Sequence, residues 1–431
     1  MNRTSLAFIL TVVTAMLIVS VACGASPTAT PISPATPTRS AQATPSAAPT
    51  ATTPTPVQGA GEFKFGVSLP LTGVGAPWGI STRNTFQIAL EEINASGGIK
   101  VGGQTYTVKL IVYDDQYTPA GGTSNANKLV FSDKVQYMSV FGGGIAPAAQ
   151  AITEPNKVLL FPGAYGKTIL LKGNNYTFRT TSDSSQFSYV TYPWIKKNYP
   201  NVKNVAIMGE NISAVVELMA DDRARAASLG WKVVSDQLAD AGTKDFAPLA
   251  AKAVAANSDL IIAEDSPASA ALMLKSIYEL GYKGLLATLT GVDVTTMLTI
   301  APKEALEGLV AGVPDWASPT MPKAANEFYA KYMTKWGPPF NVIGSEQYPV
   351  LHLLKKAIEK AGTFDTDKVK AVMTSADFTF DTPYGPSKFG DCGGIYQTAH
   401  QAEVPLFISQ VKDGKLVTIQ QITPNWSELV K

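Results

Sequence analysis

The sequence is poor in the residues from which metal and catalytic centres are usually built. Its 431 residues include two histidines and two cysteines. It has no His-Glu-x-x-His pattern or paired cysteines for zinc, and no Gly-x-Ser-x-Gly turn for a hydrolase nucleophile. His352 stands beside an apolar helical face and is interpreted as structural, while His400 lies in a polar stretch without an evident partner. We therefore predict a protein without catalytic residues, metal or cofactor.

An excess of charge of one sign is also missing. Lys and Arg number 35 and Asp and Glu number 34, which leaves a formal net charge of +1. A nucleic-acid partner normally requires a basic face, so this balance argues against one. The chain is 45% hydrophobic and 16% charged, and it is long enough for two sizeable cores. We expect a small molecule or another protein as partner.

The N-terminal region has the outline of a secretory signal. One positive residue precedes an apolar run from Leu6 to Ala22, which predicts a signal peptide over residues 1–22. The run ends V-S-V-A-C-G, which resembles the lipobox of bacterial lipoproteins and implies a lipidated Cys23, although Ser20 stands where an aliphatic residue is usual. The alternative is an uncleaved membrane anchor. Both interpretations place the rest of the chain outside the membrane and tethered to it.

Charged and aromatic residues are nearly absent from the next segment. From Gly24 to Gly61 the chain consists mainly of Pro, Thr, Ala and Ser, with Arg39 as its one charged residue. Such a segment cannot bury enough apolar surface to fold, so residues 23–61 are predicted to be a disordered linker that starts at the lipidated cysteine. With Cys23 carrying lipid, Cys392 has no partner for a disulfide and is interpreted as a buried, inert thiol.

From Glu62 onward, short apolar strands alternate with helices. F-K-F-G-V-S-L reads as a strand, and Phe86, Ala89, Leu90 and Ile93 follow it at helical spacing. A similar series of strands and helices begins near Thr181, and three helices and a strand hairpin with a Lys-Asp-Gly-Lys turn close the chain. This alternation predicts an α/β fold with two doubly wound, parallel-sheet lobes.

In such sheets, ligands bind beyond the carboxyl ends of the strands. Six loops follow predicted strands and precede predicted helices, and they span residues 70–79, 142–147, 162–168, 209–213, 264–267 and 290–293. The third loop, F-P-G-A-Y-G-K-T, ends like a nucleotide-binding loop. Its first glycine would have to stand at position 161, which is Phe161, so a phosphate-binding loop is not predicted.

Several stretches of the chain resemble the leucine/isoleucine/valine-binding proteins. They include F-G-V-S-L-P-L-T-G, E-E-I-N-A-S-G-G-I, N-K-L-V-F-S-D-K-V and F-R-T-T-S-D-S-S-Q, and the similarity runs from about Glu62 to about Ile419. The resemblance implies a periplasmic-binding-protein type I fold with a three-crossing hinge. It assigns residues 62–182 and 315–385 to the first lobe, and residues 183–314 and 386–431 to the second.

The resemblance also implies a function. It predicts an extracytoplasmic, lipid-anchored solute-binding protein of an ABC importer, which delivers its ligand to an ABC permease in the membrane. The ligand would be an amino acid of the branched-chain type, or a related small carboxylate or amide, held by closure of the lobes. The alternative is a membrane-tethered sensor that passes a binding signal to a partner receptor without transport.

The ligand residues of the family carry over only in part. Its aromatic lid matches Trp78, which either stacks on the ligand or packs its own loop. Its first-lobe anchors match the loops 142–144 and 163–165. Glycines replace the expected serines there, and Tyr165 replaces the usual Thr or Ser. Its second-lobe Tyr-Gly pair is replaced by Ser213-Ala214, and an acidic residue is present as Asp293. The candidate site residues are thus Trp78, Gly143, Gly144, Gly163, Ala164, Tyr165, Ser213 and Asp293.

The acidic residues in these loops have simpler interpretations. Asp293 stands where it could cap the helix predicted over 294–300, as an alternative to pairing with a ligand ammonium. Glu264-Asp265 and Glu210-Asn211 are interpreted as caps or solvated loop residues in preference to ligand contacts.

Overall fold

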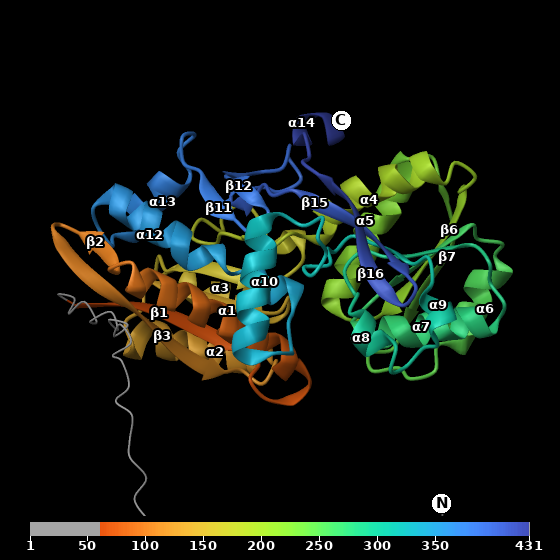
Figure 1. Ribbon diagram of the computed structural model, residues 1–431, viewed down its shortest axis with the longest axis horizontal. Coiled ribbons are helices and arrows are strands. Elements are labelled where there is room, and N and C mark those ends of the chain that lie inside the picture. Colours follow the sequence, from red (N-terminus) through yellow and green to blue (C-terminus); the bar gives the residue numbers. More distant parts are fainter. Residues whose placement is uncertain (1–60, 431) are drawn as a thin grey trace, which may run out of the picture. The chain divides into compact units, whose positions relative to one another are not determined.

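The computed structural model describes residues 61–430, without the side chains of Val74 and Ser213. The predicted signal peptide, Cys23 and the linker up to residue 60 lie outside the described residues, while Gly61, the expected last residue of the linker, begins the first strand. Within the described part of the chain, no helix is both long enough and apolar enough to cross a membrane. All the described residues belong to one compact unit (Figure 1).

The first sheet is formed by the first series of strands. Its order is β2-β3-β1-β4-β5, and only β2 runs antiparallel to its neighbour. The strands are β1 (Gly61–Leu69), β2 (Ile99–Val101), β3 (Gln104–Asp114), β4 (Tyr137–Phe141) and β5 (Leu159–Gly163). The helices among them are η1 (Gly73–Gly75), α1 (Ala76–Ala95), α2 (Pro119–Asn127), η2 (Lys128–Ser132) and α3 (Ile145–Thr153). Strand β5 extends to Gly163, which pairs with Phe141 at the end of β4.

The second sheet collects strands from two separate parts of the chain. Its order is β16-β15-β10-β9-β8-β6-β7. The strands are β6 (Asn204–Glu210), β7 (Lys232–Ala239), β8 (Leu260–Glu264), β9 (Leu285–Thr288), β10 (Val310–Ala311), β15 (Leu406–Lys412) and β16 (Lys415–Ile422). Strands β6 to β10 are parallel, and the C-terminal hairpin joins β10 antiparallel. The predicted hairpin turn is confirmed, with positive φ at both Asp413 and Gly414.

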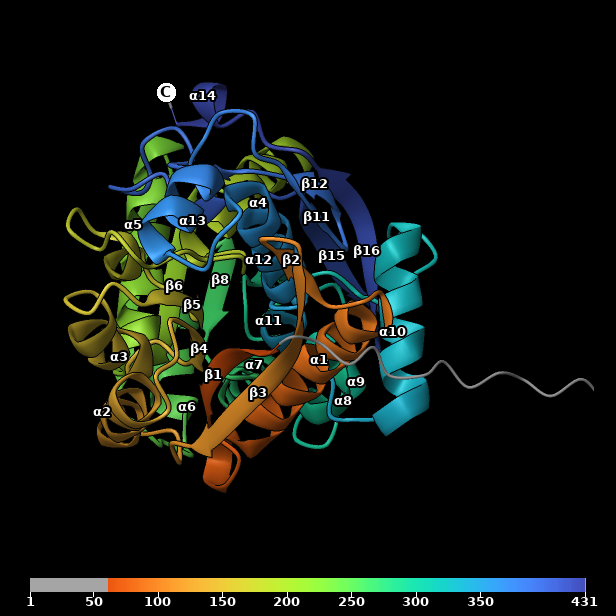
Figure 2. The same ribbon diagram turned by 90° about the vertical axis from the view of Figure 1, so that its left-hand side faces the viewer.

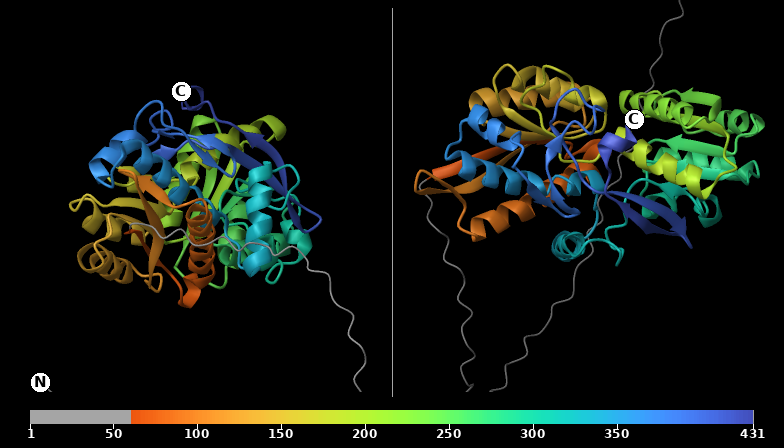
Figure 3. Two further views of the ribbon diagram at one scale, coloured as in Figure 1. Left: turned by 60° about the vertical axis from the view of Figure 1, so that its left-hand side comes forward. Right: turned by 90° about the horizontal axis from the view of Figure 1, so that it is seen from above.

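Helices cover both faces of each sheet, as the view from above shows (Figure 3, right). Those of the second series are α4 (Ser184–Asn198), α5 (Ser213–Ser228), α6 (Ala247–Ala255), α7 (Pro267–Glu279), α8 (Val294–Met297) and α9 (Lys303–Leu306). Phe246, which directly precedes α6, and Leu274 of α7 pack with Met208 and Ile261 of the sheet into one core. This arrangement confirms the predicted doubly wound design.

The chain returns to the first sheet before it ends in the second. The returning helices α10 (Lys323–Trp336), α11 (Val342–Ser345) and α12 (Pro349–Ala361) cover α1, and α13 (Thr366–Met373) follows α12 (Figures 1 and 2). They explain why the polar face of α1 is buried. Ser81 accepts a hydrogen bond from the N–H of Asn341, and Asn84 donates one to Tyr332.

The polypeptide therefore passes between the two sheets three times. The first passage follows β5, the second follows β10, and the third follows α13. Short ladders accompany the third passage, and α14 closes the chain; they are β11 (Phe380–Thr382), β12 (Gly385–Ser387), β13 (Phe389–Gly390), β14 (Gln401–Ala402) and α14 (Trp426–Leu429). The lobe boundaries expected at residues 182, 314 and 385 stay predictions.

Candidate functional site

Loops from both sheets meet at the carboxyl ends of the parallel strands. The loop after β4 contains Gly143, and a Cβ placed on that glycine would lie 3.5 Å from the Cβ of Ala214 in α5 and 3.7 Å from the carbonyl oxygen of Tyr165. The loops after β4 and β5 of the first sheet thus lie against the helix that follows β6 of the second. This is where ligands bind in open α/β sheets.

Trp78 lies near the start of α1 and is partly buried among aromatic rings. Its ring centroid is 5.4 Å from that of Tyr117 and 6.1 Å from that of Phe141, which stacks on it. These contacts support the interpretation that Trp78 packs its own loop. Stacking of Trp78 on a ligand stays a prediction.

Tyr165 lies in the loop after β5 and is surrounded by residues from both lobes. Its ring meets the edge of Phe187 in α4 at 6.2 Å between centroids. Burial raises the pKa of Tyr165 well above its ordinary value, and the carboxylates of Glu346 and Glu264 raise it further. The Tyr165 hydroxyl therefore keeps its proton throughout the physiological pH range.

The loop that carries Tyr165 is held by Arg179, a residue that the sequence analysis did not single out. The Arg179 side chain is fully buried, and its Nη1 donates to the carbonyl oxygens of Ala164 at 3.1 Å and Gly166 at 2.8 Å. Its Nε donates to Gln401 at 2.6 Å, and Nη2 forms an ion pair with Asp183 at 3.1 Å without an aligned hydrogen bond. Arg179 thus joins the loop to the first and third passages between the lobes.

Two buried carboxylates lie near Tyr165. Glu346 accepts hydrogen bonds from the Ser182 N–H at 2.9 Å and from the Tyr384 hydroxyl at 2.9 Å, and burial raises its pKa to about 7. Glu264 accepts a hydrogen bond from the Leu289 N–H at 2.7 Å, and burial likewise raises its pKa to about 7. Both groups are partly protonated near neutral pH.

The interpretation of Glu264 as a cap or solvated residue is wrong. Its side chain is fully buried and joins the ends of β8 and β9, because Leu289 directly follows β9. The neighbouring Asp265 is buried and not solvated, and its carboxylate accepts hydrogen bonds from the N–H groups of Glu210 and Ser266. Burial raises the pKa of Asp265 to about 6.

The remaining candidate residues occupy different environments. Asp293 is exposed and caps α8 by accepting from the N–H of Thr296 at 3.2 Å and from its hydroxyl at 2.9 Å. Gly144 precedes α3 without a side-chain cap, and Ser213 is the first residue of α5. Gly163 and Ala164 are buried, while Gly143 is partly exposed. A ligand contact by any of them stays a prediction.

The two histidines lie outside these loops. His400 does have partners, contrary to the expectation from sequence: its ring stacks on Phe178 at 3.9 Å between centroids, and its Nδ1 lies 3.0 Å from the Thr177 carbonyl oxygen. Burial lowers the pKa of His400 to about 4, so it is neutral near pH 7. No group of three or more His, Cys, Asp or Glu side chains in residues 61–430 is placed to hold a metal ion.

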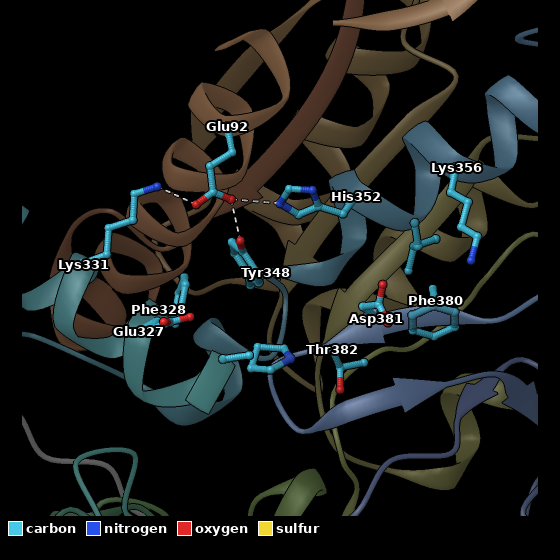
Figure 4. Close-up of a pocket in the computed structure, with 13 residues that line it drawn as sticks. Glu92, Glu327, Phe328, Lys331, Tyr348, His352, Lys356, Phe380, Asp381 and Thr382 are labelled. Carbon is cyan, nitrogen blue, oxygen red and sulfur yellow. Dashed lines mark hydrogen bonds and ion pairs between the residues drawn. The ribbon is translucent and has the colours of Figure 1, made fainter. Parts of the chain in front are cut away.

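A separate groove of about 400 Å³ lies between α1, α10, α12 and β11 (Figure 4). At its wall, the Glu92 carboxylate accepts from Lys331 at 2.5 Å and Tyr348 at 2.5 Å, and lies 3.1 Å from Nε2 of His352. Burial works against ionisation, but these hydrogen bonds lower the pKa of Glu92 to about 2. These charged groups tie α10 and α12 to α1, which agrees with a structural role for His352.

The structure has two doubly wound lobes, and the loops at the strand ends of one lobe face those of the other. This arrangement is typical of two-lobed ligand-binding proteins. The chain belongs to the periplasmic binding protein family, whose sequence model matches residues 62–415. The leucine-, isoleucine-, valine-, threonine- and alanine-binding protein of Pseudomonas aeruginosa is 26% identical over 343 residues, which cover 77% of this chain and 87% of the relative.

Solved structures of similar proteins share the fold. The leucine-binding protein LivK of Thermotoga maritima has a TM-score of 0.71 at 22% identity, covering 84% of this chain and 99% of its own. An ABC-transporter solute-binding protein from R. palustris in complex with benzoate has a TM-score of 0.70 at 19% identity, covering 84% and 97%. The predicted family and type I fold are thus confirmed, and the chain is a solute-binding protein and not an enzyme.

The role of Arg179 predicts a large loss of stability on conservative replacement. Arg179→Lys keeps a charge but cannot reach both carbonyl oxygens, Gln401 and Asp183 together, so we expect the free energy of unfolding in urea to fall by about 3 kcal/mol. Arg223→Lys is the control, because the Arg223–Asp236 pair is more than one third exposed and should matter by under about 0.5 kcal/mol. Equal losses in the two variants would contradict the role given to Arg179.

The raised pKa of Glu346 predicts a specific pH dependence. An acid whose pKa is about 7 when folded and about 4.3 when unfolded keeps its proton longer in the native state, so its ionisation destabilises the fold between those values. Glu346→Gln cannot ionise. Its free energy of unfolding, relative to the wild type, should therefore rise by up to about 3 kcal/mol from pH 5 to pH 8. Parallel stability curves for the two proteins would show that Glu346 is not protonated in the native state.

Proposed function

We propose that this protein is an extracytoplasmic, lipid-anchored solute-binding protein of an ABC importer. Its ligand is an amino acid of the branched-chain type, or a related small carboxylate or amide, which the two lobes enclose. The proposal rests chiefly on one observation: the loop of Gly143 and the loop of Tyr165, both from the first lobe, lie against α5 of the second. A ligand held there contacts both lobes at once, which is what stabilises a closed state.

The charges around this point suit a molecule with two oppositely charged ends. The loop before α3 contains Gly143 and Gly144, whose lack of side chains lets the backbone approach a ligand carboxylate closely. Glu346 and Glu264 lie near Tyr165, and an ammonium group favours their ionised forms. An amino acid has both ends, whereas a simple carboxylate such as benzoate has one.

The comparisons support this ligand class. The P. aeruginosa relative is named for binding leucine, isoleucine, valine, threonine and alanine, and the R. palustris structure holds benzoate. Lipid anchoring at Cys23 and delivery to a permease are supported by the N-terminal sequence and by the family.

The proposal is tested by ligand-induced thermal shifts of the full-length protein in detergent. The probes are L-leucine, which has both charged ends, L-leucinamide, which lacks the carboxylate, 4-methylpentanoate, which lacks the ammonium, and benzoate. We expect L-leucine to raise the melting temperature most, since a ligand at 100 times its Kd stabilises by about 2.7 kcal/mol. If none of the four probes raises the melting temperature, the proposed ligand class is wrong.

Two variants locate the site within the protein. Trp78→Ala and Tyr165→Phe should each raise the Kd for the probe that binds best by about tenfold, because each removes one contact to the ligand. Isothermal titration calorimetry measures the Kd, and Phe131→Ala serves as a control because Phe131 is an exposed aromatic residue of η2. Unchanged Kd values in both site variants would place the ligand elsewhere.

A further inference from the structure

The triplet Gly166-Lys167-Thr168, which resembles the end of a nucleotide-binding loop, contacts α5 of the second lobe. The Lys167 ammonium forms an ion pair with Asp221, and the Thr168 hydroxyl donates to Oε1 of Glu217 at 2.9 Å. A Cβ on Gly166 would lie 2.5 Å from Oε2 of Glu217, and φ at this glycine is 108°. Other residues rarely adopt this φ, so glycine permits the turn that brings the loop to α5. Three consecutive residues thus face one side of a single helix.

The triplet itself is anchored to the first lobe. It follows β5, and its last two residues begin η3 (Lys167–Leu170), where Ile169 and Leu170 are buried. The carbonyl oxygen of Ile169 accepts a hydrogen bond from Nε2 of Gln150 in α3 at 2.8 Å. The contacts with α5 therefore connect a segment fixed to the first sheet with a helix of the second.

The helix on the other side belongs firmly to the second lobe. α5 directly follows β6, and its Arg223 forms an ion pair with Asp236 of β7 at 2.9 Å. Asp221 is almost completely buried, and its carboxylate accepts from the hydroxyl of Ser185 in α4. Burial raises the pKa of Asp221, and Lys167 opposes this effect as the cation facing it.

Separating the two lobes would affect Lys167 and Asp221 differently. Lys167 is nearly half exposed and regains water easily, but Asp221 lies among the residues of the second lobe and would lose its cation. An ion pair with one buried member is screened less by water than a fully exposed pair, and it therefore contributes more. The arrangement therefore favours the state in which the lobes are together.

We propose that Lys167 and Thr168 form a latch with Glu217 and Asp221 across the two lobes, which sets the fraction of closed protein before any ligand binds. The effect of this latch on affinity rests on the proposed function, since a ligand that binds the closed state gains from a larger closed population. We assign to these residues the role of positioning the lobes.

The test measures closure without a ligand. Spin labels on Ser124→Cys in α2 and Ala268→Cys in α7, both exposed positions, report the distance between the lobes by double electron–electron resonance in the full-length protein. Lys167→Met/Asp221→Asn removes both charges and leaves no lone buried carboxylate. We expect this variant to shift the ligand-free distances toward longer values, and its Kd for L-leucine to rise about 3- to 10-fold.

Arg223→Met is the matched control, because it breaks an ion pair of the same helix that stays within one lobe. It should leave both the distances and the Kd unchanged. Unchanged ligand-free distances in Lys167→Met/Asp221→Asn overturn the latch, even if L-leucine binds normally. If L-leucine fails to bind the wild type while the variant's distances lengthen, the latch stands and the proposed ligand is wrong.

Discussion

The arrangement of this protein depends on a guanidinium group with no contact with water. Arg179 carries its charge at a fully buried position between the loop after β5 and the two segments that contribute Asp183 and Gln401. A buried charge is tolerated only when hydrogen bonds and an opposite charge compensate it. Because the compensating groups come from separate passages between the lobes, satisfying this one side chain fixes the place where the lobes join.

The position of the candidate site depends on the contacts of Arg179. Two carbonyl oxygens held by Arg179 flank Tyr165, so the aromatic side chain is fixed at the end of β5. The following residues, Lys167 and Thr168, are thereby presented to α5. The same short segment thus holds both the Tyr165 ring, a proposed ligand contact, and the residues that contact the second lobe.

The alternation of apolar and helical patterns predicted most of the fold, because the buried parallel strands and helix faces are local features of the sequence. The residues of the candidate site could be predicted less well from such local patterns. Glu346 and Glu264 look like ordinary polar residues in the sequence, and their burial depends on Ser182, Tyr384 and Leu289, which are distant along the chain. The capping role of Asp293 could be predicted from the local sequence, because this residue directly precedes α8.

The central claim is that one ligand contacts the strand-end loops of both lobes around Tyr165. Hydrogen–deuterium exchange of the full-length protein, with and without a mixture of leucine, isoleucine and valine, tests this most directly. The account predicts slower exchange in residues 142–146 and 163–168 of the first lobe, together with residues 211–217 of the second. Protection confined to one lobe, or found only around the groove of Glu92, would contradict it.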